Sequence, residues 1–221
     1  MLENIHWIIF FLIKKKKYKF ILYKKLDLDF YLRDDVIQIS KELLGKFLFS
    51  KADGIITGGM IVETEAYKGI NDKASHAYKN KINNKNRVMY RSGGISYIYL
   101  CYGLHYLFNI ITNKKTIPDA ILIRAIEPTK GLKKIIERRM ISSNQYNLTN
   151  GPGKLSKALN INKTNNGKCL INSKIWLEDR KITINNSMIN SKKRIGIDYA
   201  EEYTNKKWRF YIKNNPWVSV K

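Results

Sequence analysis

Residues 61–67 read Ile-Val-Glu-Thr-Glu-Ala-Tyr, an apolar run typical of a β-strand that also contains two carboxylates and a tyrosine. Successive side chains of a strand point to opposite faces, so Glu63, Glu65 and Tyr67 are expected on the same face. Burying acidic groups in a sheet costs free energy unless they are paired or used for chemistry. The run therefore predicts an active site, and a solvent-facing strand edge is the alternative.

The segments around this run indicate a mixture of helices and strands. Apolar residues at helical spacing between Asp34 and Gly45 predict a helix that Gly45 ends. Strands are predicted at 46–50 and 55–67, joined through a turn at Asp53-Gly54. Further strands are expected at 95–101, 104–112, 120–128, 175–178 and 207–213, and further helices at 131–140 and 154–159. Because strands and helices follow one another without regular alternation, we expect an α+β fold on a largely antiparallel sheet.

The chain is strongly basic. Its 221 residues include 41 Lys and Arg against 18 Asp and Glu, a formal net charge of +23. Such an excess favours polyanionic partners, nucleic acid ahead of membrane surfaces. Many lysines lie beside asparagine and isoleucine, as in 79–86 and 160–168, which is typical of a codon-biased genome. The charge therefore supports nucleic-acid binding without proving it.

The cysteines and histidines indicate neither disulfides nor a metal. The chain has only two cysteines, Cys101 and Cys169, which gives no disulfide framework and no cysteine metal site. A reducing, cytoplasmic setting fits this composition best. His6, His76 and His105 lie far apart and match no metal-binding spacing. We therefore expect neither a metal nor a cofactor.

Residues 1–33 differ in character from the rest of the chain. An apolar run at 5–13 is followed by four lysines at 14–17. Nine apolar residues are too few to span a bilayer, and a signal peptide would place its basic segment first. We expect 1–33 to be a dispensable extension outside the core, without stable membrane association. A peripheral membrane or polyanion anchor is the alternative.

Two further features point to the chemistry of residues 61–67. Arg124 lies in the otherwise apolar run 120–126, where a guanidinium requires a buried partner, and Glu63 or Glu65 is the natural candidate. A purely structural ion pair between two strands is the alternative. An ionised carboxylate could activate water as a general base, whereas the pair of carboxylates could instead bind Mg²⁺.

The segment 97–106 predicts an aromatic hairpin with Tyr102 at an exposed tip. Apolar side chains at such tips wedge between base pairs in proteins that bend DNA, although the tyrosines could equally be packing residues. A three-residue loop at 102–104 places Tyr99 opposite Leu107 and Tyr97 opposite Asn109, so that Tyr99 and Asn109 share a face. A two-residue loop would put them on opposite faces.

Two segments offer groups for a nucleic-acid backbone. Residues 69–94 are polar and basic, and are expected to form a long loop. Residues 150–156 read Asn-Gly-Pro-Gly-Lys-Leu-Ser, which does not match a phosphate-binding P-loop. A glycine turn into a helix start still offers backbone N–H groups to one phosphate, so Gly153 and Lys154 are candidate backbone contacts, with a plain helix start as the alternative.

Taken together, several segments resemble the alkyladenine (3-methyladenine) DNA glycosylase family. They are VETEAY, the loop around His76, YIYLCYGLHYLFN, AILIRAIEP, NGPGKLS and the closing RFYIKNNPWVSV. The resemblance covers roughly 34–221 and rests on the ordered set, since each fragment alone is weak. It implies an enzyme that flips alkylated or deaminated purines out of duplex DNA and hydrolyses the N-glycosidic bond, leaving an abasic site.

The resemblance also implies residue roles. Glu65 would be the general base that deprotonates the attacking water, and Arg124 and the Ile195 carbonyl would help to position that water. Asn109 would stand where the exocyclic amino group of a normal guanine would clash, and Tyr102 would fill the gap left in the duplex. The remaining pocket residues are expected to be Tyr67, His76 and Tyr99. This arrangement needs the three-residue hairpin loop, which we therefore adopt.

The expected protein is a single DNA glycosylase domain at 34–221, built on a curved, largely antiparallel β-sheet with flanking helices and a protruding β-hairpin. Its partner would be double-stranded DNA containing damaged purines. We expect a monomer in a bacterial-type cytoplasm, associated with the nucleoid. A Mg²⁺-dependent nuclease that uses Glu63 and Glu65, and a nucleic-acid-binding protein without catalysis, are the competing interpretations.

Overall fold

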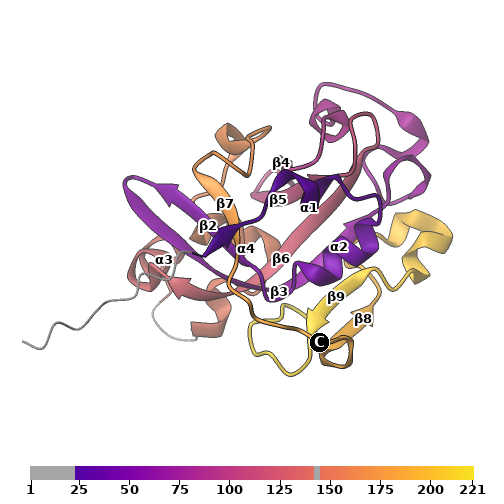
Figure 1. Ribbon diagram of the computed structural model, residues 1–221. Coiled ribbons are helices and arrows are strands. Elements are labelled where there is room, and N and C mark those ends of the chain that lie inside the picture. The colour runs from indigo at the N-terminus through magenta and orange to yellow at the C-terminus, as the bar shows by residue number, and fades with distance from the viewer. Residues whose placement is uncertain (1–22, 142–144) are drawn as a thin grey trace, which may run out of the picture.

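The computed structural model describes residues 23–141 and 145–221, which form an α+β domain on a curled antiparallel sheet (Figure 1). The strand order is β1-β7-β2-β3-β6-β5-β4, and β9 pairs with both β3 and β8. The strands are β1 (Lys24–Lys25), β2 (Phe47–Ala52), β3 (Ile55–Tyr67), β4 (Ile95–Cys101), β5 (His105–Thr112), β6 (Asp119–Lys130), β7 (Ile175–Asp179), β8 (Ile189–Lys192) and β9 (Arg209–Ile212). The predicted fold class is confirmed.

Strand β3 is the longest strand and the centre of the sheet. It pairs with β2 through its first half, with β6 over most of its length and with β9 at Glu63–Glu65. The register with β6 shifts on both sides of Glu63. Such bulges bend a strand and redirect its side chains. The central strand is therefore irregular at the two carboxylates that the sequence singles out.

Two glycines allow the backbones to approach closely where β3 bends. A Cβ added at Gly58 would lie 2.2 Å from the carbonyl oxygen of Leu48, and one at Gly59 would lie 1.9 Å from that of Glu127. No side chain fits at either position without moving the backbone. The paired glycines thus permit the curl between β2, β3 and β6.

Both predicted hairpins are present. The turn between β2 and β3 is Asp53-Gly54, and both residues have positive φ, as a two-residue hairpin turn requires. Between β4 and β5, Cys101 pairs with His105, which leaves the three-residue loop 102–104. The register therefore sets Tyr99 opposite Leu107 and Tyr97 opposite Asn109, as predicted.

In the described part of the chain, four α-helices flank the sheet: α1 (Leu28–Leu32), α2 (Val36–Glu42), α3 (Leu132–Arg139) and α4 (Pro152–Ala158). The predicted helix after Asp34 is α2, and Asp35 begins it by accepting the backbone N–H groups of Ile37 and Gln38. Helix α2 packs on β3, β6 and β9, whereas α4 packs on β5 and β6. Short 3₁₀ helices follow in the loops: η2 (Gly69–Asn71), η3 (Tyr78–Asn80), η4 (Arg87–Tyr90), η5 (Gln145–Leu148), η6 (Lys163–Asn165), η7 (Asn186–Met188) and η8 (Asp198–Asn205).

The 69–94 segment and η8 lie at the same end of the sheet. Figure 1 shows the former in magenta and the latter in yellow, both at the right of the view. Ala74 of the loop forms a small apolar cluster with Ile197 and Ala200. The expected long loop is confirmed, and it packs against a distant part of the chain.

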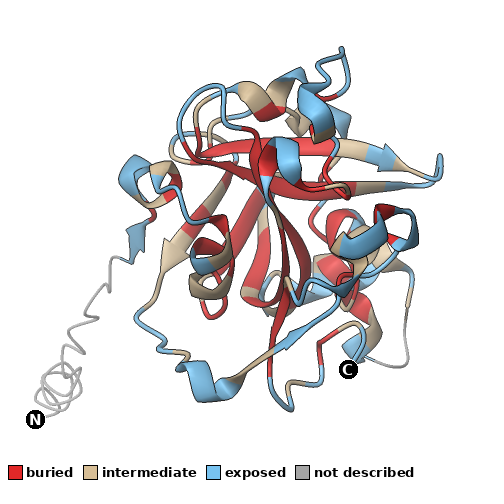
Figure 2. Ribbon diagram, turned by 90° about the vertical axis from the view of Figure 1, so that its right-hand side faces the viewer, coloured by how far each residue is buried: buried red, intermediate tan, exposed pale blue. Residues whose placement is uncertain are grey.

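The buried core runs along the central strands and under the helices, as the red ribbon in Figure 2 shows. It includes residues that we expected to lie outside the domain. Tyr31 is fully buried, Leu26 is 7% exposed, and β1 pairs with β7. The predicted boundary at residue 33 is therefore wrong: residues 24–32 contribute apolar side chains and strand pairing to the core.

The apolar run at 5–13 and the lysines at 14–17 lie outside the described residues. Among the residues that are described, no helix has both the length and the apolar character needed to cross a membrane.

Replacing Tyr31 tests whether the segment before residue 33 belongs to the core. Tyr31→Ala should lower the free energy of unfolding by about 3–5 kcal/mol, because it removes a fully buried ring. Tyr31→Phe should cause no loss, because the buried hydroxyl has no hydrogen-bond partner among the described residues. Equilibrium denaturation with urea measures both, and a cost below about 1 kcal/mol for Tyr31→Ala would contradict the corrected boundary.

Candidate active site

Glu63 is fully buried, and donors from three directions satisfy its carboxylate. Arg124 Nε and Arg209 Nη1 both donate to Oε1, at 3.0 and 2.9 Å. Ser219 near the chain end donates its backbone N–H to Oε2 at 2.7 Å and its hydroxyl to Oε1 at 2.9 Å. The carboxylate therefore joins β3, β6, β9 and the C-terminal segment, and four donors hold its two oxygens.

Glu65, two residues along β3, is also fully buried but has a different set of partners. Its Oε1 accepts the backbone N–H of Ile195 at 2.8 Å and lies 3.2 Å from Arg124 Nη1. Its Oε2 accepts the Tyr67 hydroxyl at 2.9 Å. Three donors from three segments fix the carboxylate, and fewer of them are cations than at Glu63.

Arg124 connects the two carboxylates. Its guanidinium donates to Glu63 through Nε and approaches Glu65 through Nη1, as the sequence predicted for an arginine in an apolar strand. Burial opposes the charged form of this group, but the adjacent charges of Glu65 and Glu63 outweigh burial and raise the pKa of Arg124. The arginine remains a cation, so one fixed positive charge serves both acidic groups.

A cavity of about 230 Å³ opens beside Glu65. Tyr67, Arg124 and Ile195, which are the three contacts of the Glu65 carboxylate, all line it. The cavity is smaller than the roughly 300–1,000 Å³ of pockets for drug-sized ligands. Its size suits one compact group such as a single base, with the carboxylate directly behind the wall.

Aromatic rings form much of the cavity wall. His76 from the 69–94 loop lies edge-on to Tyr99, with ring centroids 4.5 Å apart, and His76 Nδ1 is 2.7 Å from the Tyr97 hydroxyl. Desolvation by the surrounding wall lowers the pKa of His76, so its imidazole is neutral at pH 7. Burial also raises the pKa of Tyr67, Tyr97 and Tyr99 above the ordinary value, so all three hydroxyls keep their protons.

The hairpin contributes the remaining predicted residues. Asn109 lines the cavity on β5 and donates its side-chain amide to the Tyr97 carbonyl at 3.2 Å. Tyr102 is 87% exposed at the loop tip and also borders the cavity. The structure thus brings together Glu65, Arg124, Ile195, Tyr67, His76, Tyr99, Asn109 and Tyr102 around one cavity.

Comparison with known proteins identifies the family of the chain. The family model for methylpurine-DNA glycosylase matches residues 29–216. The chain belongs to the methylpurine-DNA glycosylase family. A relative from Natranaerobius thermophilus is 49% identical over 197 residues, which cover 89% of this chain and 99% of the relative. One from Chlamydia felis is 47% identical over 83% of this chain and 93% of its own length, and one from Clostridium acetobutylicum is 44% identical over 89% and 98%. All three are named, provisionally, as 3-methyladenine DNA glycosylases.

Membership of this family makes the chain a DNA repair glycosylase, an enzyme that hydrolyses N-glycosyl bonds and acts on DNA. The resemblance drawn from the sequence motifs is confirmed. The match begins at residue 29, within the segment that the structure adds to the core.

Gly153 and Lys154 of this glycosylase lie at the start of α4, and neither position is free of other constraints. A Cβ at Gly153 would lie 2.8 Å from the His105 ring, so the glycine is needed for packing against the hairpin. The Lys154 ammonium donates to the Asn147 and Asn150 side chains, at 2.5 and 3.0 Å. Contact with a DNA phosphate stays a prediction for both residues.

Sequence reasoning did not identify several residues of the site. Arg209 lies in an apolar strand, the same signal that identified Arg124, and could have been found in that way. Tyr199 of η8 is 67% exposed and lines the cavity mouth, but no motif distinguishes it from other tyrosines. Asn86 holds the His76 carbonyl with its side-chain amide at 2.8 Å, which only the loop conformation reveals.

The alternative of a magnesium site at Glu63 and Glu65 does not fit their surroundings. Both Glu63 oxygens already accept hydrogen bonds, and two of these hydrogen bonds come from arginine cations. A divalent cation would have to displace these donors and lie beside Arg124. Across residues 23–141 and 145–221, no group of three or more His, Cys, Asp or Glu side chains could hold a metal ion.

Replacing Glu63 tests its structural importance in the glycosylase. Glu63→Gln should lower the free energy of unfolding by about 3–5 kcal/mol, because Arg124 and Arg209 would remain buried without their shared anion. The matched control, Glu137→Gln, removes a carboxylate that is 64% exposed and should not change stability measurably. If the two variants were equally stable in equilibrium denaturation, Glu63 would not have the structural importance inferred here.

Asp119, the first residue of β6 beside the cavity-lining Ala120, gives a prediction about pH. Burial raises its pKa to about 6, against an ordinary value of 3.8, although a hydrogen bond from Asn113 partly offsets this. The folded state therefore holds the Asp119 proton more tightly than the unfolded state. The resulting stabilisation is complete below pH 3.8 and is lost as the pH rises through about 6.

Urea denaturation of wild type and Asp119→Asn between pH 4 and pH 7 measures this effect. The stability of wild type relative to the variant should fall as the pH rises through this window, because only wild type deprotonates the buried carboxyl. A constant or rising difference would show that the carboxyl titrates normally in the folded protein.

Proposed function

We propose that this glycosylase removes alkylated or deaminated purines that have been flipped from duplex DNA, with Glu65 as the general base. The observation that supports this most strongly is the placement of the buried Glu65 carboxylate behind a base-sized cavity, between Arg124 and Ile195. An ionised carboxylate at that point can take a proton from water and stabilise positive charge on the sugar. The names of the relatives, 3-methyladenine DNA glycosylases, fit the same substrate class.

In this proposal, Arg124 and the Ile195 carbonyl position the attacking water. Arg124 is held by Glu63, and the Ile195 backbone is held by its N–H donation to Glu65, so neither group needs to reorganise. Donors and acceptors that folding has already oriented near the reacting atoms lower the activation free energy, because they do not have to be ordered during the reaction. Hydrolysis gives the free base and an abasic sugar, with the water supplying the hydroxyl group at C1′.

The cavity wall would select the base. Tyr67, His76 and Tyr99 offer aromatic surfaces for stacking, and electron-rich faces favour a positively charged alkylated purine through cation–π attraction. The His76 carbonyl, which accepts one bond from Asn86, has a second acceptor position for the base edge. Asn109 would exclude normal guanine by contact with its exocyclic amino group.

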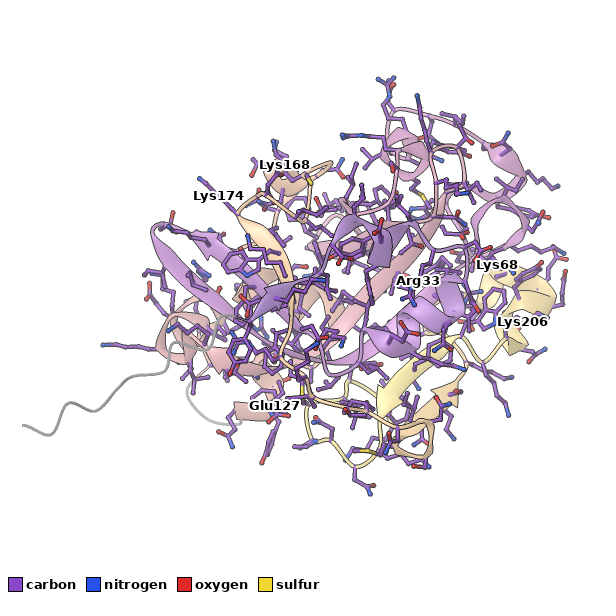
Figure 3. All side chains as sticks on the ribbon, in the orientation of Figure 1. Arg33, Lys68, Glu127, Lys168, Lys174 and Lys206 are labelled. Carbon is purple, nitrogen blue, oxygen red and sulfur yellow. The ribbon has the colours of Figure 1, made fainter. Side chains whose placement is uncertain are left out.

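Flipping the nucleotide would depend on the hairpin tip and on phosphate contacts. Tyr102 is exposed at the tip and borders the cavity, so it can occupy the space that the flipped base leaves. Basic side chains occur on several sides of the molecule: Figure 3 labels Lys68 and Lys206 at the right of the view and Lys168 and Lys174 at the upper left. Phosphate contacts, with Gly153 and Lys154 among the candidates, would make binding salt-dependent.

We further propose that the protein acts as a monomer in the cytoplasm, at the nucleoid. The Glu65 carboxylate has three partners within its own chain, Tyr67, Arg124 and Ile195, and the proposed mechanism needs no residue of a second subunit. A chain with a net charge of +23 is attracted to chromosomal DNA.

Base release from a defined lesion tests the proposal. Wild type should convert a duplex that carries one hypoxanthine or one ethenoadenine into alkali-labile DNA in the presence of EDTA, with free base as the second product. Glu65→Gln should bind the same duplex and release no base, because the neutral amide cannot accept the proton. Alkali cleavage of labelled strands and a gel-shift titration measure the two properties.

Controls separate this outcome from the competing functions. Glu137→Gln, which changes an exposed carboxylate in α3, should keep the wild-type rate. Strand cleavage that needs no alkali and stops in EDTA would indicate the nuclease. Base release by Glu65→Gln at the wild-type rate would remove Glu65 as the base, and binding without release from these duplexes or from alkylated DNA would leave a binding protein.

A further inference from the structure

A second buried ion pair lies close to Glu65, the proposed general base. Arg194 and Asp72, 122 positions apart in the chain, both have fully buried side chains. Arg194 Nη2 donates to Asp72 Oδ1 at 2.8 Å, and Nη1 donates to Oδ2. This two-pronged geometry fixes the guanidinium in both position and orientation.

The Asp72 side of the pair shapes the wall of the base cavity. Its carboxylate accepts the backbone N–H groups of Lys68 and Ala74, at 3.1 and 3.0 Å. Its carbonyl accepts the N–H of Ser75 at 2.8 Å. The turn that these bonds define leads directly into Ala74, Ser75 and His76, which line the cavity.

The Arg194 side reaches the strand of the proposed base. Nη1 also donates to the carbonyl of Ala66, which lies between Glu65 and Tyr67, at 2.9 Å. The guanidinium carbon is 4.7 Å from the centre of the Tyr67 ring and 5.1 Å from the Trp208 ring. Arg194 is thus held at once by the 69–94 loop, by β3 and by an aromatic side chain near β9.

The next residue in the chain is Ile195, whose N–H donates to Glu65. Ile195 itself is 37% exposed, and Gly196, which follows, has positive φ and open space where a side chain would lie. On the side of Ile195 that precedes it in the chain, the segment is held by the buried Arg194, and on the other side Ile197 packs with Ala74 and Ala200. A shift of Arg194 would move the Ile195 backbone relative to the Glu65 carboxylate.

We propose that Arg194, held by Asp72, is a positioning residue that sets the distance between the Ile195 backbone and the Glu65 carboxylate. The inference rests on the proposed role of Glu65 as the base. The ion pair does not touch the reacting atoms. It acts by joining the cavity wall, the strand that carries Glu65 and the segment that positions the water into one rigid unit. Small displacements of such groups can cost about 10²-fold in rate.

The test uses Arg194→Lys, which keeps the charge and loses the planar fork and the stacking. Its single-turnover rate of hypoxanthine release, measured with saturating enzyme, should fall by roughly 10- to 100-fold. Its dissociation constant for the same duplex should stay within about threefold of wild type, because the cavity wall and hairpin still form. Asp72→Glu, which lengthens the partner by one methylene, should act in the same direction.

Two comparisons distinguish positioning from general stability. Leu177→Ala removes a fully buried side chain on β7, which β2 separates from β3 and which contributes no residue to the cavity. It should lower the melting temperature without changing the single-turnover rate of the folded enzyme. The double variant Arg194→Lys/Asp72→Glu should recover part of the rate, since the longer carboxylate can reach the ammonium. Additive losses in the double variant, or a Leu177→Ala rate as low as that of Arg194→Lys, would overturn the inference.

The outcomes also separate this inference from the proposed function. If wild type releases hypoxanthine, Glu65→Gln does not, and Arg194→Lys retains the wild-type rate, the positioning role is wrong while Glu65 remains the base. If Glu65→Gln releases base at the wild-type rate, both are wrong. If Arg194→Lys does not fold, the single-turnover rate of Asp72→Glu is the test instead. A rate equal to that of wild type would overturn the positioning role of Arg194.

Discussion

The structure depends on the burial of the Glu63 carboxylate at the centre of the sheet. An isolated charge there would cost several kcal/mol, so folding must deliver compensating donors. They come from Arg124 on β6, Arg209 on β9 and Ser219 near the chain end. The charge can be accommodated only when all these segments are in place, which ties the register of three strands and the C-terminal segment to one side chain. The bulges on either side of Glu63 are the local consequence.

This arrangement allows the neighbouring carboxylate to do chemistry. Arg209 supplies a second cation to Glu63, so Arg124 can also direct a nitrogen towards Glu65. The remaining contacts of Glu65 are neutral donors, the Tyr67 hydroxyl and the Ile195 N–H, and all of its contact residues line the cavity. Two carboxylates at strand spacing thus have different surroundings: Glu63 is held by four donors, two of them from arginines, whereas Glu65 lies beside a base-sized space. The same alternation that put both on one face made it impossible to distinguish them from spacing alone.

Local patterns in the sequence predicted much of this arrangement. The strand at 61–67 and the need of Arg124 for an acidic partner follow from periodicity and charge, and both are confirmed. The three-residue hairpin loop is also confirmed, but it was chosen over a two-residue loop only through the family resemblance. Other features depend on distant segments meeting. The pairing of Asp72 with Arg194 had no local signal, because Asp72 lies in a polar loop and Arg194 directly follows two lysines. Ile195 was reached only through family resemblance, since its backbone rather than its side chain contacts Glu65. The boundary at residue 33 failed because a two-residue strand and a five-residue helix are too short to produce a periodic pattern.

The most direct test of the account is a crystal structure of the enzyme on a duplex that carries a cationic pyrrolidine nucleotide in place of the damaged one. The ring cation mimics the positive charge that develops on the sugar during hydrolysis. The account predicts the modified nucleotide turned out of the duplex, a water between the Glu65 carboxylate and the carbon that replaces C1′, and Glu63 still bound by Arg124, Arg209 and Ser219. A water held by another residue, or a Glu63 carboxylate released towards the nucleotide, would contradict the division of roles between the two carboxylates.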